Sequence, residues 1–212
     1  MTTLAQQLIN GLTVGSLYAL MALGLTMVYG VLRVLHIAHA GVFTLGAYAG
    51  LWAFRLSGSF WVALLAAMAA AALCGLAMER WVYSPLLAKP PMTTLIASIG
   101  LFIGLEEVYR IVAGPQPYGF EVQLALPDLR AGGLFLSAPQ LMVALVTGSL
   151  LLGLWLLLAR TNVGLAIRAA SQDAEMAMAC GMDTRRLVTL TFAVGSALAG
   201  AGGMLVGIFY SS

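Results

Sequence analysis

Residues 160–186 read RTNVGLAIRAASQDAEMAMACGMDTRR, a polar stretch in a chain that is otherwise almost wholly apolar. The flanking residues 131–159 and 187–212 carry no charge, and each run is long enough to span a membrane. A charge at the centre of a bilayer costs at least a few kcal/mol, so this stretch must lie in water between two spans. Seven charged residues lie within it: Arg160, Arg168, Asp173, Glu175, Asp183, Arg185 and Arg186.

The composition of the whole chain is that of an integral membrane protein. Hydrophobic residues make up 61% of the 212 residues and charged residues 8%, whereas soluble domains carry roughly a quarter charged residues. The net charge of +2 comes without a long basic run, which argues against a nucleic-acid-binding surface. The two cysteines, Cys74 and Cys180, are far apart in sequence and form no disulfide framework or zinc pattern.

Long apolar runs predict an all-α integral membrane protein, a polytopic bundle of about six transmembrane helices in a single membrane domain over residues 1–212. No Lys or Arg precedes Arg33, so the first run lacks the basic region of a signal peptide and is expected to be a retained span. Prolines predict a loop at 84–91, Thr93 or Thr94 can cap the next helix, and residues 114–139 are expected to form an external loop. The expected spans are 7–32, the stretch from 41 to 54, 56–78, 93–113, 140–159 and 187–210.

Residues 33–41, RVLHIAHAG, predict a break between the first two helices. Non-helical backbone at membrane depth is tolerated only where protein or a water-filled cavity surrounds it, so the break indicates a transport pathway. The i, i+3 spacing of His36 and His39 would also suit a metal or catalytic site. No carboxylate or cysteine lies nearby to complete a ligand set, and the simpler interpretation is two interfacial histidines.

The fourth expected span carries Glu106, Glu107 and Arg110. Acidic residues within a membrane suggest an ion or proton site. However, the i, i+4 and i, i+3 spacings allow Arg110 to pair with both carboxylates on one helix face. Pairing and snorkelling near the end of the span therefore explain these charges without transport chemistry.

The distribution of basic residues predicts the orientation in the membrane. Basic residues are enriched in cytoplasmic loops, and placing residues 160–186 in the cytoplasm puts seven basic residues inside and three outside. The N-terminus is then outside. The inside set is Arg33, Arg80, Lys89, Arg160, Arg168, Arg185 and Arg186, and the outside set is Arg55, Arg110 and Arg130.

A short helix near 171–181 is predicted inside the polar stretch. Asp173 and Glu175 follow Ser171 at a helix start, where carboxylates suit the positive end of the helix dipole, and Gly181 can end the helix. The residues between them form a small methionine-containing surface that suits docking into a groove on a soluble partner, with Arg168, Arg185 and Arg186 at its rim. The alternative is an amphipathic helix that lies on the membrane without a partner.

Several ordered motifs resemble the permease subunits of branched-chain amino acid ATP-binding-cassette (ABC) importers, and the likeness covers almost the whole chain. In the polar stretch and the following helix they are GLAIRAA at 164–170, GMDT at 181–184 and LTFAVG at 190–195. Towards the N-terminus they are NGLTVGSLYAL at 10–20, TMVYG at 26–30 and AHAG at 38–41, followed by Glu79-Arg80, Tyr83, Pro85-Leu86 and LIASIG at 95–100.

The resemblance implies a multi-pass protein of the bacterial inner membrane, surrounded by lipid, that pairs with a second permease subunit. Two ATP-binding subunits would dock on the cytoplasmic side and a periplasmic substrate-binding protein on the outside. The chain has no Gly-x-x-x-x-Gly-Lys-Ser/Thr motif, so ATP and Mg²⁺ are expected on the partners and no cofactor on this chain. The substrate would be a branched-chain amino acid or a related small polar compound such as urea or an amide.

The resemblance also implies roles for individual residues and suggests that the chain is incomplete at its C-terminus, because similar permeases continue through further spans. No residue is expected to be catalytic or to bind a metal. Two interpretations from other classes remain: a secondary transporter that uses Glu106 and Glu107, and a membrane-embedded enzyme that uses His36 and His39. The residues expected to couple the chain to an ATPase subunit are Arg168, Asp173, Glu175, Met176, Gly181, Asp183 and Arg185. The candidate pathway residues are Asn10, Tyr18, Thr26, His36 and His39.

Overall fold

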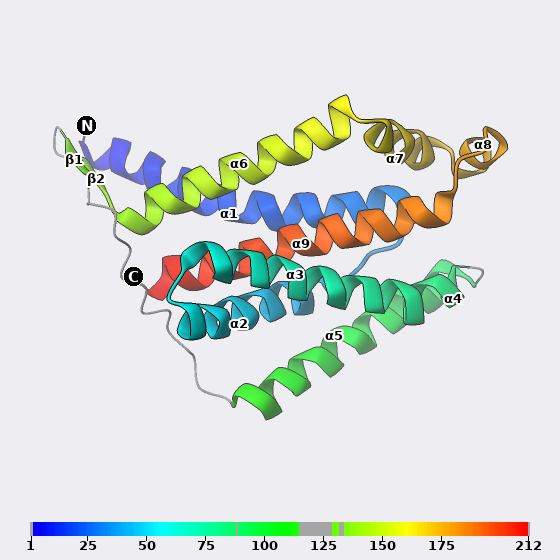
Figure 1. Cartoon of the computed structure of the whole chain (residues 1–212), viewed down its shortest axis with the longest axis horizontal. Helices are drawn as coiled ribbons and strands as arrows, with labels where there is room; N and C mark the ends of the chain where they lie inside the picture. Colours follow the sequence, from blue (N-terminus) through cyan, green and yellow to red (C-terminus); the bar gives the residue numbers. More distant parts are fainter. Residues whose placement is uncertain (1, 88, 115–128, 132–133, 212) are drawn as a thin grey trace.

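The computed structural model describes residues 2–87, 89–114, 129–131 and 134–211, which are helical apart from a short β-hairpin and the connecting turns (Figure 1). The predicted all-α class is therefore confirmed. The long helices are α1 (Thr2–Leu32), α2 (His39–Ser57), α3 (Phe60–Met78), α5 (Pro91–Ala113), α6 (Ala138–Arg160) and α9 (Thr184–Ser211). The shorter elements are the π-helical turn η1 (Glu79–Tyr83), α4 (Ser84–Leu86), β1 (Leu129–Ala131), β2 (Leu134–Leu136), α7 (Asn162–Gln172) and α8 (Ala174–Ala179).

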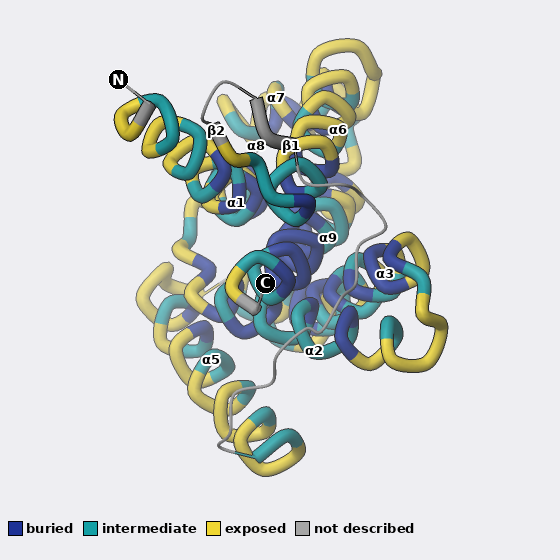
Figure 2. Tube along the Cα trace, turned by 90° about the vertical axis from the view of Figure 1, so that its left-hand side faces the viewer, coloured by how far each residue is buried: buried dark blue, intermediate teal, exposed yellow. Residues whose placement is uncertain are grey.

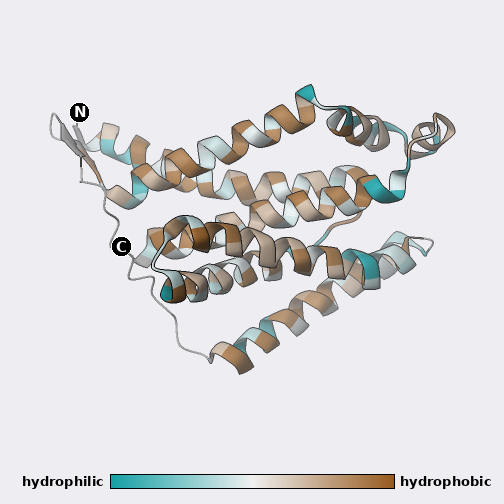
Figure 3. Cartoon of the chain, viewed as in Figure 1, coloured by the Kyte–Doolittle hydropathy of each residue, from teal (hydrophilic) through white to brown (hydrophobic). Residues whose placement is uncertain are grey.

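Within the described ranges, four helical stretches are long and apolar enough to cross a membrane, Thr3–Leu32, Phe60–Leu86, Ala138–Arg160 and Thr184–Tyr210 (Figure 3). The predicted count of six spans is not confirmed, since α2 and α5 are not among the four. The charged residues Glu106, Glu107 and Arg110 lie in the second half of α5, and α2 carries His39 at its start and Arg55 in its last turn.

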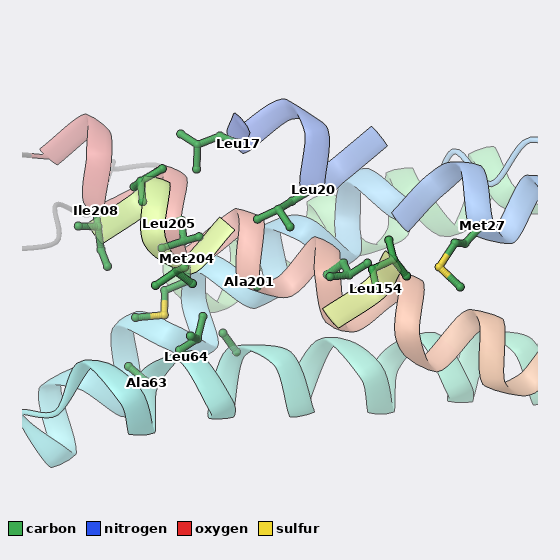
Figure 4. Close-up of a cluster of buried hydrophobic side chains, with 14 of the residues drawn as sticks. Leu17, Leu20, Met27, Ala63, Leu64, Leu154, Ala201, Met204, Leu205 and Ile208 are labelled. Carbon is green, nitrogen blue, oxygen red and sulfur yellow. The ribbon is translucent and has the colours of Figure 1, made fainter. Parts of the chain in front are cut away.

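Helix α9 lies at the centre of the bundle and contacts α1, α2, α3 and α6 (Figures 1 and 2). Its apolar side chains are buried along most of its length. Leu17 and Leu20 of α1, Leu64 of α3, and Met204 and Leu205 of α9 belong to one hydrophobic cluster (Figure 4). Because its apolar side chains are buried against these neighbours, α9 is the helix around which the others pack.

Glycines allow α1 and α9 to approach closely. A Cβ atom on Gly24 would lie 2.6 Å from the carbonyl oxygen of Gly195, and one on Gly195 would lie 2.7 Å from the carbonyl oxygen of Gly24. Small residues serve this purpose in membrane helices, where backbones can pack directly against each other. By contrast, a Cβ atom added to Gly11 or Gly15 on the same helix would meet no atom within 4 Å, so α1 also has an open face.

The chain leaves helical geometry where the sequence predicted a break. Helix α1 ends at Leu32, Arg33 has a φ of 55°, and α2 begins at His39, so the non-helical segment is 33–38 and is shorter than the predicted 33–41. His36 and Ala38 within this segment are buried, as is His39 at the start of α2. We name residues 33–38 the α1–α2 linker.

Two predicted boundaries around the prolines were wrong. The third helix continues beyond Met78 through the π-helical turn η1 and α4 to Leu86, so Pro85 lies in helical backbone. Proline lacks an N–H group and disrupts the regular i to i−4 ladder, and the π-helical turn directly before it is such an altered ladder. Helix α5 begins at Pro91 with Pro90 in the N-cap position, and so is not capped by Thr93 or Thr94.

The helices place their connections at two opposite ends of the molecule (Figure 1). One end holds α4, α7 and α8, and the other holds the hairpin β1–β2 and both termini. Helix α4 and helices α7 and α8 thus lie at the same end, as the topology predicted from the basic residues requires. Of the expected external loop 114–139, residues 115–128 and 132–133 lie outside the described residues, while 129–131 pair with 134–136 in an antiparallel ladder.

Candidate functional site

The polar stretch 160–186 forms two consecutive helices rather than the single one predicted near 171–181. The Thr161 hydroxyl caps α7 by accepting a hydrogen bond from the Gly164 N–H at 3.0 Å. Ile167 and Ala170 are buried, which fixes one face of α7 against the bundle. Ser171 belongs to the last turn of α7, where its hydroxyl donates to the Arg168 carbonyl, so it does not begin the following helix.

Helix α8 is fixed at both ends by local contacts. The Asp173 carboxylate is its N-cap and accepts a hydrogen bond from the Met176 N–H at 3.0 Å. At the other end Gly181 has a φ of 81°, its N–H donates to the Met178 carbonyl, and the Met182 N–H donates to the Ala177 carbonyl. This pair of bonds is the Schellman motif, so the predicted helix stop at Gly181 is confirmed with its mechanism.

The exposed surface of α8 is apolar apart from Glu175. Met176 and Met178 are 62% and 52% exposed, whereas Ala177 between them is buried against the bundle. Glu175 lies in the first turn and is exposed, where its charge favours the helix N-terminus. The arrangement presents two flexible thioether side chains at the end of the molecule that also holds α4, and methionines of this kind adapt well to a partner surface.

Several charged residues of the polar stretch form hydrogen bonds or ion pairs that hold the stretch in its fold. Arg168 donates from its guanidinium to the Leu158 carbonyl at the end of α6. Asp183 accepts a hydrogen bond from the Arg186 N–H at 3.2 Å, and the two side chains also form an ion pair at 2.8 Å. Arg185 is exposed and lines a cavity of about 550 Å³ with Arg80 and residues of α4.

A second group of candidates is buried at the α1–α2 linker. His36 Nδ1 lies 2.6 Å from the Tyr83 hydroxyl, which donates to the Ser98 hydroxyl at 2.9 Å, and the Ala38 N–H donates to the same Ser98 oxygen at 3.1 Å. With Tyr83 donating to Ser98, the Nδ1–H tautomer of His36 can donate to Tyr83. The His36 and His39 rings are 5.5 Å apart, between centroids.

The prediction that these two histidines are interfacial was wrong, because both are 1% exposed. They are enclosed by residues distant in sequence, among them Tyr83 and Phe192, whose rings lie 5.0 and 5.2 Å from His36. Among the described residues, no group of three His, Cys, Asp or Glu side chains is placed to hold a metal ion. Tyr83 and Ser98 were not singled out as site residues from the sequence, although both fall in the quoted motifs.

The other candidate pathway residues do not join the histidines. Asn10 accepts hydrogen bonds from Gln6 and Gln140 near the opposite end of the bundle. Tyr18 is 62% exposed, and Thr26 is exposed and donates to the Leu23 carbonyl of its own helix. The structure therefore brings together only His36 and His39 of the five candidates.

The predicted charge pairs on α5 are confirmed. Arg110 lies 3.7 Å from carboxylate oxygens of both Glu106 and Glu107, and all three side chains are more than half exposed. An intramembrane ion site would need these carboxylates in an enclosed position with converging ligands. Their exposed, mutually paired arrangement does not supply it.

Comparison with known proteins decides the family. Residues 7–212 match the family described as "Branched-chain amino acid transport system / permease component". The chain belongs to this family. The high-affinity branched-chain amino acid transport system permease protein BraD of Pseudomonas aeruginosa is 34% identical over 224 residues, which cover 97% of this chain and 71% of BraD. The permease protein LivH of Escherichia coli K12 is 32% identical with the same coverage.

A more distant relative is the probable branched-chain amino acid transport permease protein LivH of Methanocaldococcus jannaschii, 28% identical over 90% of this chain and 62% of its own length. No solved structure matches the chain. Membership of the permease family confirms the resemblance that the motifs carry and makes the chain a transport permease rather than an enzyme. The roles of individual residues in the polar stretch and at the linker stay predictions.

Proposed function

We propose that this chain is a transmembrane permease subunit of an ABC importer for branched-chain amino acids, and that residues 160–186 dock onto an ATP-binding subunit. The observation that carries the docking proposal is α8, a capped helix that exposes Met176 and Met178 at one end of the bundle. The proposed substrate class follows from the names of BraD and LivH. Urea and amides are the alternatives that the sequence resemblance offers.

The proposed assembly contains a second permease subunit, two ATP-binding subunits that hold ATP and Mg²⁺, and a periplasmic substrate-binding protein, in the bacterial inner membrane. The open face of α1 supports a neighbour in the membrane, whether lipid or the second permease, because Leu8, Leu12 and Tyr18 are exposed along it. In this assembly all six long helices would cross the bilayer, with α2 and α5 stabilised there by protein neighbours. The linker with His36 and His39 is the proposed part of the pathway.

The orientation can be tested with the native cysteine of the polar stretch. Cys180 is exposed, and Ser57 at the end of α2 is exposed at the opposite end of the bundle. In a Cys74→Ala background, we expect Cys180 to resist a membrane-impermeant thiol reagent in intact cells and to react after permeabilisation. A Ser57→Cys, Cys180→Ser variant should react in intact cells. Labelling in the reverse pattern would show that residues 160–186 are outside.

The docking role can be tested with the two exposed methionines. Met176→Gln combined with Met178→Gln keeps the length of each side chain and its helix propensity but makes the face polar. Burying a methionine stabilises by roughly 1.5 to 3 kcal/mol, so we expect affinity for the ATP-binding subunit to fall by about tenfold or more. Purified permease and its ATP-binding subunit, titrated by fluorescence in detergent, give this affinity.

Met92→Gln is the matched control, because Met92 is 64% exposed in the first turn of α5 but lies outside the docking stretch. This variant should bind the ATP-binding subunit as the unmodified chain does. Equal affinities for the double variant, the control and the unmodified chain would reject residues 160–186 as the docking element. Family membership would stand in that case, since it does not depend on this surface.

A further inference from the structure

Arg33 ends helix α1 in an unusual backbone conformation. Among the described residues it is the one non-glycine residue with positive φ, at 55°. Its N–H donates to the Tyr29 carbonyl at 2.7 Å, which closes the last turn of α1. Positive φ is uncommon for a residue with a side chain and persists where surrounding contacts hold it in place.

The contacts that hold Arg33 come from the polar stretch, far away in sequence. Its guanidinium Nη2 donates to the Gln172 carbonyl at 2.7 Å and to the Ser171 carbonyl at 3.2 Å. These are the last two residues of α7, where carbonyl groups lack partners within the helix and the dipole is negative. A guanidinium is well suited to this position, because it donates several hydrogen bonds in a fixed geometry and always carries its charge.

The last turns of α1 and α7 also lie side by side. A Cβ atom on Gly30, one turn before Arg33, would lie 4.0 Å from the Cβ atom of Ser171. Directly after Gln172 comes Asp173, whose carboxylate caps α8. The guanidinium of Arg33 is therefore attached to the junction between α7 and the exposed helix α8.

On its other side Arg33 begins the α1–α2 linker, whose far end is fastened inside the bundle. His36 bonds to Tyr83 of η1, and the Ala38 N–H bonds to Ser98 of α5. The linker thus connects the α7–α8 junction at one end with η1 and α5 at the other.

We propose that Arg33 is a positioning residue that transmits displacement of α7 and α8 to the α1–α2 linker, and thereby to the buried His36 and His39. The inference rests on the proposed docking of residues 160–186 to an ATP-binding subunit. When that subunit moves α8, the end of α7 moves with it, and the guanidinium carries the motion to the linker. Arg33 makes no contact with the ATP-binding subunit in this mechanism.

Arg33→Gly separates the backbone role of this residue from its guanidinium. Glycine adopts positive φ without strain, so a purely structural helix end would be preserved or improved. The proposal instead expects normal association with the ATP-binding subunit but substrate uptake into proteoliposomes reduced by about tenfold or more, since a charge-assisted contact is lost. ATP hydrolysis should continue without stimulation by substrate-loaded binding protein. Arg33→Lys keeps the positive charge but not the planar guanidinium with its paired N–H donors, and it should recover part of the uptake.

A reversible disulfide can replace the guanidinium. The 4.0 Å distance between Cβ positions of residues 30 and 171 lies within the range that disulfides span. In a background without Cys74 and Cys180, the pair Gly30→Cys and Ser171→Cys is expected to give the same uptake when oxidised as when reduced, because the two turns move together. Combined with Arg33→Gly, the oxidised pair should restore the lost uptake, and reduction should abolish it again.

Three results would overturn the inference. Full, coupled uptake by Arg33→Gly would assign Arg33 a structural role only. Loss of ATP-binding-subunit association in Arg33→Gly would place the residue in the docking surface itself. Inhibition of uptake by the disulfide in a chain that keeps Arg33 would mean that α1 and α7 separate during transport, and this measurement remains informative even if Arg33→Gly does not fold. None of these outcomes contradicts the docking proposal, because the methionine variants test it separately.

Discussion

Replacing Gly24 by alanine is expected to destabilise the bundle, although alanine is the better helix former. The added Cβ would lie 2.6 Å from the Gly195 carbonyl oxygen and 3.0 Å from Nε2 of the buried His39. Backbone atoms cannot yield as a flexible side chain does, so α1 and α9 must move apart. Overpacking of this kind costs roughly 1 to 3 kcal/mol, and reversible unfolding of the purified protein in detergent measures the loss.

Gly15→Ala is the matched control on the same helix. A Cβ at this position meets no atom within 4 Å, so only the helix propensity changes. The free energy of unfolding should rise by up to about 1 kcal/mol or stay the same. The prediction for Gly24 fails if both variants are equally stable, which would mean that α1 and α9 do not cross at Gly24 and Gly195.

Replacing Tyr83 by phenylalanine removes a single hydroxyl group and is expected to destabilise the protein. Tyr83 is 1% exposed, and its hydroxyl lies between His36 Nδ1 and the Ser98 hydroxyl. Without that oxygen, His36 Nδ1 and the Ser98 hydroxyl each lose a hydrogen-bond partner. Leaving buried polar groups unpaired costs roughly 1 to 3 kcal/mol, measurable by the same unfolding assay.

Tyr29→Phe provides the control, because Tyr29 is 47% exposed on α1 and its hydroxyl is not enclosed in this network. A change of less than about 0.5 kcal/mol is expected for it. Ser98→Ala extends the test: if Tyr83 and Ser98 act as one network, the double variant should lose less stability than the sum of the two single variants. Strictly additive effects would show that the two hydroxyl groups act independently.

The local structure of the polar stretch could largely be predicted from the sequence, because helix caps depend on neighbouring residues. The sequence predicted a short helix that starts after Ser171, with Asp173 and Glu175 in its first turn, and ends at Gly181. The structure places the N-cap bond at Asp173 instead and a positive φ at Gly181 as predicted. The sequence did not reveal that Ser171 belongs to a preceding helix. Packing of Ile167 and Ala170 against the bundle stabilises α7, and that contact is tertiary.

The buried histidines show the opposite case. Their i, i+3 spacing within the predicted break at 33–41 suggested two interfacial histidines, which is the reasonable interpretation when only neighbouring residues are considered. Burial of His36 depends on residues far along the chain: the Tyr83 hydroxyl lies 2.6 Å from its Nδ1, and the Phe192 ring lies 5.2 Å from its ring. No local pattern encodes which polar residues will meet.

The sequence by itself determined the membrane class, the helical fold, the permease family and the polar stretch 160–186, because long apolar runs, clustered charges and ordered motifs are properties of the linear chain. Tertiary structure alone decided that α9 is central, that Gly24 meets Gly195, and that Arg33 bonds to residues 138 and 139 positions away. Contacts at such separations depend on how helices pack, and packing is set by all the neighbouring helices together rather than by any one segment.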